Sequence, residues 1–362
     1  MGVPPLWDGA PGVFGKAKKG DDVSYWRPLA QAGRLRPEGA LPIAGGWTWF
    51  THAARLERGA APRVLPAAEV PHEVLTRISA PRAPVARLTL DRPRVMAILN
   101  ATPDSFSDGG LHAAPEAALA GARRLIGEGA DLLDIGGEST RPGAAPVPDS
   151  EEASRVVPVI RAVAAEWGGP ISIDTRKATV AAQAVESGAG LVNDVSALTY
   201  DAGMAGLVAE SGLPICLMHA RGDPQTMQDA PEYADVLLDV YDFLAGRVAA
   251  AEAAGIARDR IVVDPGIGFG KTVAHNLALL EGLSLFHALG CPILLGVSRK
   301  RFIGTLGEAP QARDRMPGSI AVALAGLAQG VQIIRVHDMG ATRQAVRLWR
   351  AASGAEIEGV ER

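Results

Sequence analysis

The chain has 362 residues, of which 48% are hydrophobic and 21% are charged, and its formal net charge is −4. These values are typical of a globular protein with one large domain, or with one large and one small domain. They argue against a basic nucleic-acid-binding stripe, and no apolar run approaches the roughly 18 residues of a membrane span. We therefore expect neither nucleic acid nor a membrane as a partner.

The two cysteines, Cys216 and Cys291, each lie inside an apolar run. Two such thiols predict neither a disulfide framework nor a zinc site, so we expect both to be buried and reduced. The N-terminus has Trp7, Pro11 and several lysines where a signal peptide has an apolar core. A cytoplasmic location is the interpretation that follows.

Residues 1–92 differ in composition from the rest and are expected to be an extension, partly disordered or a small β element. Four of the six tryptophans lie here. Residues 1–25 scatter Gly and Pro around a lysine cluster, which predicts a mobile tail. Residues 42–59 place aromatic, strand-like residues beside a Gly-Gly turn signal and predict a short hairpin. The residues indicate no function for this extension.

A regular alternation of apolar runs and helical stretches fills residues 93–352, and residues 353–362 form a tail. The eight runs are VMAIL, DLLDI, ISID, GLVNDV, PICLM, IVVD, PILLGV and QIIRV. Apolar strands joined by helices form a parallel sheet, and eight units favour a closed (β/α)₈ TIM barrel over a doubly wound sheet. Several helical stretches end at a glycine suited to a left-handed cap: Gly129, Gly188, Gly212, Gly255, Gly290 and Gly330.

Polar residues end almost every predicted barrel strand. In barrels of this kind, chemistry takes place at the carboxyl ends of the strands. A scaffold does not need such groups at this rim, so we interpret the ring as a functional site. In chain order the strand ends carry Asn100, Asp134 with Glu138, Asp174, Asn193 with Asp194, Met218 with His219, Asp264, Ser298 with Lys300, and Arg335 with His337.

Three glycine-containing segments follow barrel strands. Residues 99–110 (LNATPDSFSDGG) and 136–144 (GGESTRPGA) carry groups that hydrogen-bond an anion, although turns of this composition also occur without a ligand. Residues 265–272 (PGIGFGKT) fail the phosphate-loop pattern, because a proline stands at the position of its first glycine. We expect these glycines to let a flat ligand lie against the backbone.

Two carboxylates and one amide end three different strands. Asp174, Asn193 and Asp264 each stand where a helix N-cap is common, so each alone has a structural explanation. Together they suit a ligand that presents several N–H donors along one edge.

The last two strands predict an anion site, because loops at this place usually bind phosphate with the help of a helix N-terminus, here at residues 338–340. Lys300, Arg335 and His337 lie at strand ends, whereas Arg301 is explained by a solvated surface. No histidines show metal-ligand spacing. A hard cation held by Asn100 and ligand phosphate oxygens fits Mg²⁺, which keeps several waters.

Together these segments resemble the dihydropteroate synthases. The motifs ILNATPDSFSDGG, DIGGESTRPGA, SIDT, NDVSA, LMHARG, DPGIGFGK, GVSRKRFIG and RVHD occur in that family's order over roughly residues 93–352. The resemblance implies a transferase that joins 6-hydroxymethyl-7,8-dihydropterin diphosphate to the amine of 4-aminobenzoate and expels diphosphate. RLTLDRPRV (residues 87–95) also resembles the strand pair that caps the barrel floor in that family.

The resemblance assigns a ligand to each group of site residues. The pterin edge would be bound by Asp174, Asn193, Asp264 and Lys300 and its faces by Met218, Phe269 and Arg335, with Asp134 just beneath. The diphosphate would be held by Thr140, Arg141, Arg335, His337 and, through Mg²⁺, Asn100. The 4-aminobenzoate pocket would combine loops 99–110 and 136–146 with Ser298, Lys300, Phe106 and Pro142. The implied catalytic residues are Asp174, Lys300, Arg335 and His337.

Two other functions remain open. A pterin-binding methyltransferase that passes a folate methyl group to a corrinoid shares the barrel, but it does not need the SRK lysine or the RVHD anion site. A non-catalytic pterin-binding barrel is disfavoured by the intact loops.

Arg221 and Arg301 stand where the family varies or has a small residue, and they have no assigned role. We also expect a homodimer, which no residue pattern supports, and small-molecule substrates as the other partners.

Overall fold

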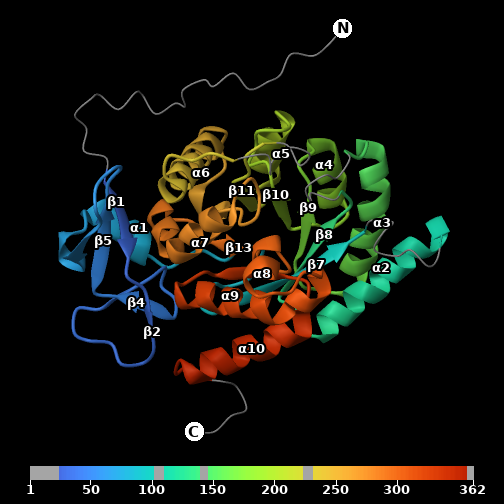
Figure 1. Ribbon diagram of the computed structural model, residues 1–362. Helices are drawn as coiled ribbons and strands as arrows, with labels where there is room; N and C mark the ends of the chain where they lie inside the picture. Colours follow the sequence, from blue (N-terminus) through green and yellow to red (C-terminus); the bar gives the residue numbers. More distant parts are fainter. Residues whose placement is uncertain (1–23, 102–109, 139–145, 223–230, 357–362) are drawn as a thin grey trace.

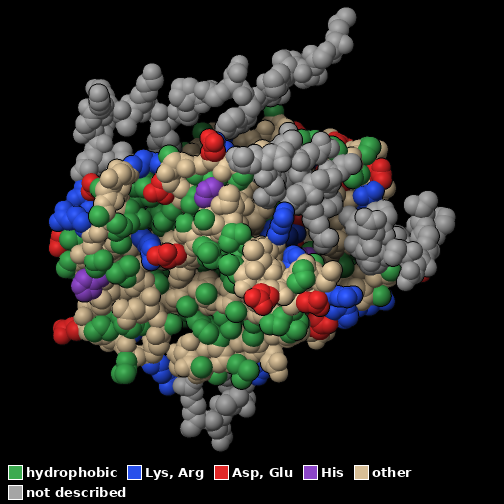
Figure 2. All heavy atoms as spheres, viewed as in Figure 1, with side chains coloured by type: hydrophobic (Ala, Val, Ile, Leu, Met, Phe, Trp, Pro, Cys, Tyr) green, Lys and Arg blue, Asp and Glu red, His purple; other side chains and the backbone are tan. Residues whose placement is uncertain are grey.

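Figure 1 shows a computed structural model that describes residues 24–101, 110–138, 146–222 and 231–356. The predicted tail up to residue 23 and the site residues Phe106, Thr140, Arg141 and Pro142 lie outside these ranges. Acidic and basic side chains are interspersed over the face shown in Figure 2. None of the described helices is long and apolar enough to cross a membrane.

Eight parallel strands form the barrel, and each coincides with one of the predicted apolar runs. Their order in the sheet is β12-β11-β10-β9-β8-β7-β14-β13. A parallel bridge between Val263 and Ile293 joins the two ends of this order, so the barrel closes. The bounds are β7 Arg94–Asn100, β8 Leu132–Gly136, β9 Ile171–Asp174, β10 Leu191–Asp194, β11 Ile215–Met218, β12 Ile261–Asp264, β13 Leu294–Leu295 and β14 Ile333–Val336. The predicted TIM barrel is confirmed.

Helices surround the barrel in the predicted alternation. They are α2 Gly110–Gly127, α3 Asp149–Glu166, α4 Ala178–Glu186, α5 Gly203–Ser211, α6 Val236–Ala253, α7 Val273–Glu281, α8 Arg301–Leu306, α9 Met316–Ala328 and α10 Met339–Ala352, with short 3₁₀ turns η3 Arg258–Arg260 and η5 Ala312–Arg315. All six glycines predicted as caps have positive φ, from 69° to 116°. One expectation was wrong. Residues 275–290 (HNLALLEGLSLFHALG) are one of the helical stretches of the sequence pattern and were expected to form a single helix ending at Gly290. Instead α7 ends at Glu281, and after Gly282, where a Cβ would lie 2.5 Å from Leu237, the chain continues as η4 Leu283–Leu289.

The barrel interior is apolar at the amino ends of the strands. Val85 and Leu90 close this end, and Val85 forms an antiparallel bridge with Leu88, so the expected cap on the barrel floor is one bridge rather than a strand pair. Both residues belong to a buried cluster with inward-pointing strand residues, namely Met96, Leu132, Leu191, Cys216, Val262, Leu294 and Ile333. Both cysteines are buried and free, as predicted. The amino ends of the strands are therefore filled by apolar side chains, and the predicted polar site residues lie at the carboxyl ends.

The extension folds as two three-stranded antiparallel sheets and a helix beside the barrel (Figure 1). The sheets are β1 Tyr25–Pro28 with β5 His52–Leu56 and β6 Arg63–Pro66, and β2 Gln31–Ala32 with β4 Thr48–Phe50 and β3 Leu41–Pro42; η1 Ala67–Glu69 and α1 His72–Ser79 follow. The expected hairpin is therefore present as β3 and β4. Tyr25 donates to Asp242 of α6 at 2.9 Å, and the indole of Trp47 donates to the carbonyl of Leu327 in α9 at 2.8 Å. These bonds attach the extension to α6 and α9.

Candidate active site

The carboxyl ends of the barrel strands bring the predicted polar residues together. Since all eight strands are parallel, their last residues face one rim. Five of the predicted residues are at least 92% buried there, each from a different strand: Asp134 of β8, Asp174 of β9, Asn193 of β10, Met218 of β11 and Asp264 of β12. Four of the five are polar, and burial of polar groups is costly unless each has a partner, so their contacts decide what the site can do.

One guanidinium holds two of the buried carboxylates. Arg335 of β14 donates from Nε to Oδ2 of Asp134 at 2.6 Å and from Nη2 to Oδ2 of Asp174 at 2.6 Å. The amide of Asn193 also donates to Oδ2 of Asp134, at 3.2 Å. Four predicted site residues from four strands therefore form one hydrogen-bonded cluster. Arg335 was expected to contact the pterin face and to bind the diphosphate. The structure shows that it also neutralises the charge of Asp134 and Asp174.

The second oxygen of each carboxylate is left without a partner. Oδ1 of Asp134 and Oδ1 of Asp174 are buried, and neither accepts a hydrogen bond from any described residue. Burial raises the pKa of Asp174 to about 7, against the opposing charge of Arg335 and with help from the charge of Asp134. Two acceptors without donors, next to an amide, suit a ligand edge that carries N–H groups.

Asp264 and Lys300 form a second part of the rim. Burial raises the pKa of Asp264 to about 6, while the N–H of Gly266, at 2.7 Å from Oδ1, and the nearby charge of Lys300 act against that rise. The ammonium of Lys300 lies 3.8 Å from the ring centroid of Phe269. This cation–π contact brings together two residues that the sequence predicted separately.

The glycines after Asp264 have a structural role that the sequence did not reveal. We expected them to admit a flat ligand. A Cβ on Gly266 would lie 1.8 Å from the carbonyl oxygen of His219, and one on Gly270 would lie 2.5 Å from that of Arg221. Both residues also have positive φ, 66° and 61°. They are therefore needed for the loop after β12 to pack on the loop after β11.

The loops after β13 and β14 meet at Ser298 and His337. The backbone N–H of His337 donates to Oγ of Ser298 at 3.1 Å, and Nδ1 of the imidazole lies 3.0 Å from the same oxygen. Nearby, Arg299 forms an ion pair with Asp338 at the start of α10. The helix N-terminus expected to bind an anion is less open than predicted, because the N–H of Gly340 donates to Glu128 at 3.0 Å.

The sequence interpretation missed Lys271. Its ammonium is buried, lies 2.9 Å from Nδ1 of His219 and donates to the carbonyl of Phe269 at 3.0 Å. Burial lowers the pKa of Lys271 to about 7. The residue thus ties the loop that carries Phe269 to the loop after β11. Its signal was present in the DPGIGFGK motif, but no role was assigned to that lysine from the sequence.

Asn100 ends β7 at the rim, paired across the sheet with Gly136. Its side chain is half-buried and makes no hydrogen bond with any other described residue. The described residues contain no group of three His, Cys, Asp or Glu side chains arranged to hold a metal. Among the residues that the structure describes, the proposed donor is the amide oxygen of Asn100, which fits a cation that takes most of its ligands from water and from phosphate oxygens.

Comparison with known proteins identifies relatives along the barrel. Residues 96–337 match the family of pterin binding enzymes. The dihydropteroate synthase of Escherichia coli K12 is 45% identical over 269 residues, which are 74% of this chain and 95% of that protein. Among solved structures, Xanthomonas albilineans dihydropteroate synthase with 4-aminobenzoic acid has a TM-score of 0.71 and 50% identity, covering 74% of this chain and 96% of that one. The same enzyme in complex with 7,8-dihydropteroate has a TM-score of 0.68 and 47% identity, covering 74% and 97%.

Proposed function

Because the chain belongs to the family of pterin-binding enzymes, we propose that the buried rim cluster of Asp134, Asp174, Asn193 and Arg335 is its pterin site. The reaction is that of its dihydropteroate synthase relatives: 6-hydroxymethyl-7,8-dihydropterin diphosphate and 4-aminobenzoate give 7,8-dihydropteroate and diphosphate. The observation that carries the site proposal is the pair of buried acceptors, Oδ1 of Asp134 and Oδ1 of Asp174, that have no donor among the described residues.

In this proposal the pterin edge donates its N–H groups to Asp134, Asp174 and Asp264. Asn193 and Lys300 bind the same edge. Met218, Phe269 and Arg335 contact the ring faces. As the bond from the methylene carbon to the diphosphate oxygen breaks, positive charge develops on the pterin. Ionised Asp174 and Asp264 stabilise this charge. The amine of 4-aminobenzoate then forms the new C–N bond at the methylene carbon and loses a proton.

The departing diphosphate needs positive charge and donors. His337 and Arg335 lie at the end of β14 and can supply both. We propose that Thr140 and Arg141 also bind diphosphate, and that Ser298, Lys300, Phe106 and Pro142 line the 4-aminobenzoate pocket. Asn100 would hold Mg²⁺, which when bound neutralises charge on the diphosphate oxygens.

The experiment is a direct assay of 7,8-dihydropteroate formation from the two substrates, with Asp174→Asn as the test variant. Losing one charged hydrogen-bond acceptor should lower kcat/KM about 10- to 100-fold. Asp259→Asn is the control, because Asp259 is exposed in η3, before the amino end of β12. Full activity of Asp174→Asn would remove this carboxylate from the site.

Two further proposals concern the setting of the enzyme. The two buried free thiols support a reducing compartment, the cytoplasm. We also propose a homodimer, the commonest assembly of soluble enzymes. The extension contacts α6 and α9, so the interface would use other helices of the barrel. Sedimentation velocity at micromolar concentration distinguishes a dimer from a monomer.

A further inference from the structure

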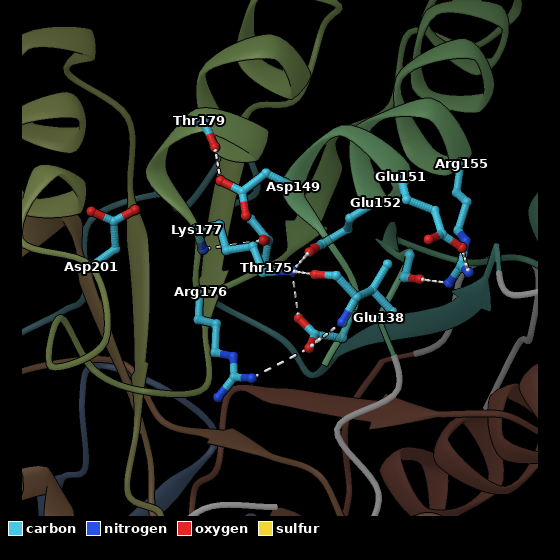
Figure 3. A network of polar contacts seen from close by, with 12 residues as sticks. Glu138, Asp149, Glu151, Glu152, Arg155, Thr175, Arg176, Lys177, Thr179 and Asp201 are labelled. Atoms are coloured by element: carbon cyan, nitrogen blue, oxygen red, sulfur yellow. Dashed lines mark hydrogen bonds and ion pairs between the residues drawn. The ribbon is translucent and has the colours of Figure 1, made fainter. Parts of the chain in front are cut away.

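A buried cluster of two carboxylates and two cations lies beside the site, where β8 and β9 end (Figure 3). The ammonium of Lys177 lies 2.6 Å from Oε2 of Glu152 and 3.0 Å from Oε2 of Glu138. The guanidinium of Arg176 reaches Oε1 of Glu138 at 3.3 Å. The side chains of Lys177, Glu138 and Glu152 are only 4%, 6% and 0% exposed. The proposed reaction uses none of these four groups, so their burial needs another explanation.

Lys177 binds both flanks of the segment that carries Thr140 and Arg141. Besides its two carboxylates, the ammonium donates to the backbone carbonyl of Val147 at 2.5 Å. The N–H of Val147 in turn donates to Oε1 of Glu138 at 3.3 Å. Glu138 is the last described residue before that segment, and Val147 follows closely after it. One ammonium thus connects the point where the segment leaves β8 with the point where it approaches α3.

The β8 side of this connection is also fixed by α3. Arg155 donates to the carbonyl of Gly137 at 2.7 Å. A Cβ at Gly137 would lie 2.8 Å from Val156 and 3.0 Å from the carbonyl of Glu152, so the backbone here already touches the helix. On the other side, Lys177 comes three residues after Asp174 in the turn that follows β9. The cluster therefore links the pterin carboxylate to both flanks through short, buried contacts.

We propose that Lys177 is a positioning residue for the reaction: it sets the separation of Glu138 and Val147 and the distance of both from Asp174. This inference rests on the proposed role of Thr140 and Arg141 in ligand binding. A cluster that only joined α3 to α4 would not need to bind the flanks. The two helices are already connected by an exposed hydrogen bond, in which Thr179 of α4 donates to Asp149 of α3 at 2.5 Å.

The test is steady-state kinetics of Lys177→Met/Glu152→Gln. The double variant removes the ammonium together with its most buried partner charge, so it leaves no unpaired carboxylate at position 152. We expect kcat/KM for 4-aminobenzoate to fall about 10- to 100-fold, because a shift of about 1 Å in a binding group has an effect of this size. The affinity for 6-hydroxymethylpterin, measured by calorimetry without diphosphate, should stay at the wild-type value. Lys177→Arg should recover part of the activity.

Thr179→Val is the matched control, since it loosens the same helix pair without touching either flank, and it should keep wild-type kinetics. An equal loss of pterin affinity and of kcat/KM would show that the cluster merely supports the rim, and would overturn the inference. Unchanged kinetics in the double variant would overturn it as well. Arg141→Ala separates the two proposals: if it is fully active, the role of the segment is wrong; if it is impaired while the double variant is not, only the positioning role of Lys177 is wrong.

Discussion

Replacing Arg335 with methionine should destabilise the protein in a pH-dependent way. Arg335 is the shared partner of Asp134, which is 0% exposed, and Asp174, which is 8% exposed. At about 4 Å between charge centres and an effective dielectric constant of about 20, each pair contributes about 4 kcal/mol of gross attraction. In the variant, protonation of one acid relieves part of this loss. We therefore expect a net cost of about 3–5 kcal/mol in the free energy of unfolding, at a pH where both acids are ionised in the wild-type protein.

The sign of the pH dependence follows from Asp174. Its folded-state pKa of about 7 is above the ordinary value of 3.8, so the native protein binds a proton that the unfolded chain releases. Wild-type stability from this group is therefore present at low pH and is lost as pH rises towards 7. Without Arg335 the pKa of Asp174 rises further, because the opposing positive charge is gone. The cost of Arg335→Met should then be smaller at pH 5, where Asp174 is protonated and the pair with Asp134 is the main loss, than at pH 8, where both pairs are lost.

Urea unfolding followed by tryptophan fluorescence at pH 5 and pH 8 measures both quantities. Arg343→Met is the control, because Arg343 pairs with Asp131 at the other end of the barrel, where Arg92 and Arg94 also hold that carboxylate. The control should lose less than about 1 kcal/mol at either pH. Equal destabilisation by Arg335→Met at the two pH values would refute this account of how Arg335 holds Asp134 and Asp174.

Three further predictions concern the ligands. Chelation should abolish dihydropteroate formation and added Mg²⁺ should restore it, with Asn100→Ala requiring more Mg²⁺; full activity in excess chelator would contradict this. His337→Ala should weaken diphosphate binding in calorimetry and slow turnover while leaving the unfolding midpoint unchanged, and wild-type affinity would remove His337 from the anion site. Because the residues proposed for diphosphate and 4-aminobenzoate share the segments 99–110 and 136–146, the aryl amine and sulfonamides that imitate it should bind tightly only with pyrophosphate and Mg²⁺ present. Equal affinity with and without pyrophosphate would exclude this coupling.

The barrel was predictable because its signals are local. Each strand is buried on both faces, so each reads as a short apolar run, and each helix that closes on a left-handed glycine shows that glycine in the sequence. The positions of Asp174, Asn193 and Asp264 at one rim then follow from the parallel direction of the strands. The contact at Gly282 was not predictable in this way, because the side chain that excludes a Cβ there belongs to Leu237, 45 residues earlier in the chain.

The partners of the site residues could not be read from the sequence. Arg335 and Asp134 are 201 residues apart, and no local pattern indicates that they share a hydrogen bond. The same holds for Gly266, where a Cβ would collide with the carbonyl oxygen of His219, 47 residues earlier in the chain. Lys177 was overlooked because a lysine just before a helix is usually a solvated residue. Its burial against Glu138 and Glu152 appears only once three neighbouring elements are assembled.

These contacts explain why the site is costly to the fold and useful to the reaction. The pterin cluster holds two carboxylates against one guanidinium, so at neutral pH it carries either a net negative charge or an extra proton. A ligand edge with N–H donors supplies the hydrogen bonds that Oδ1 of Asp134 and Oδ1 of Asp174 lack, and these bonds favour the ionised form of Asp174. Ionised carboxylates are what the reaction needs when the methylene carbon becomes positive. An apolar rim of the same volume would make the barrel more stable, but it could neither select an N–H-rich ring nor stabilise the charge that forms on it.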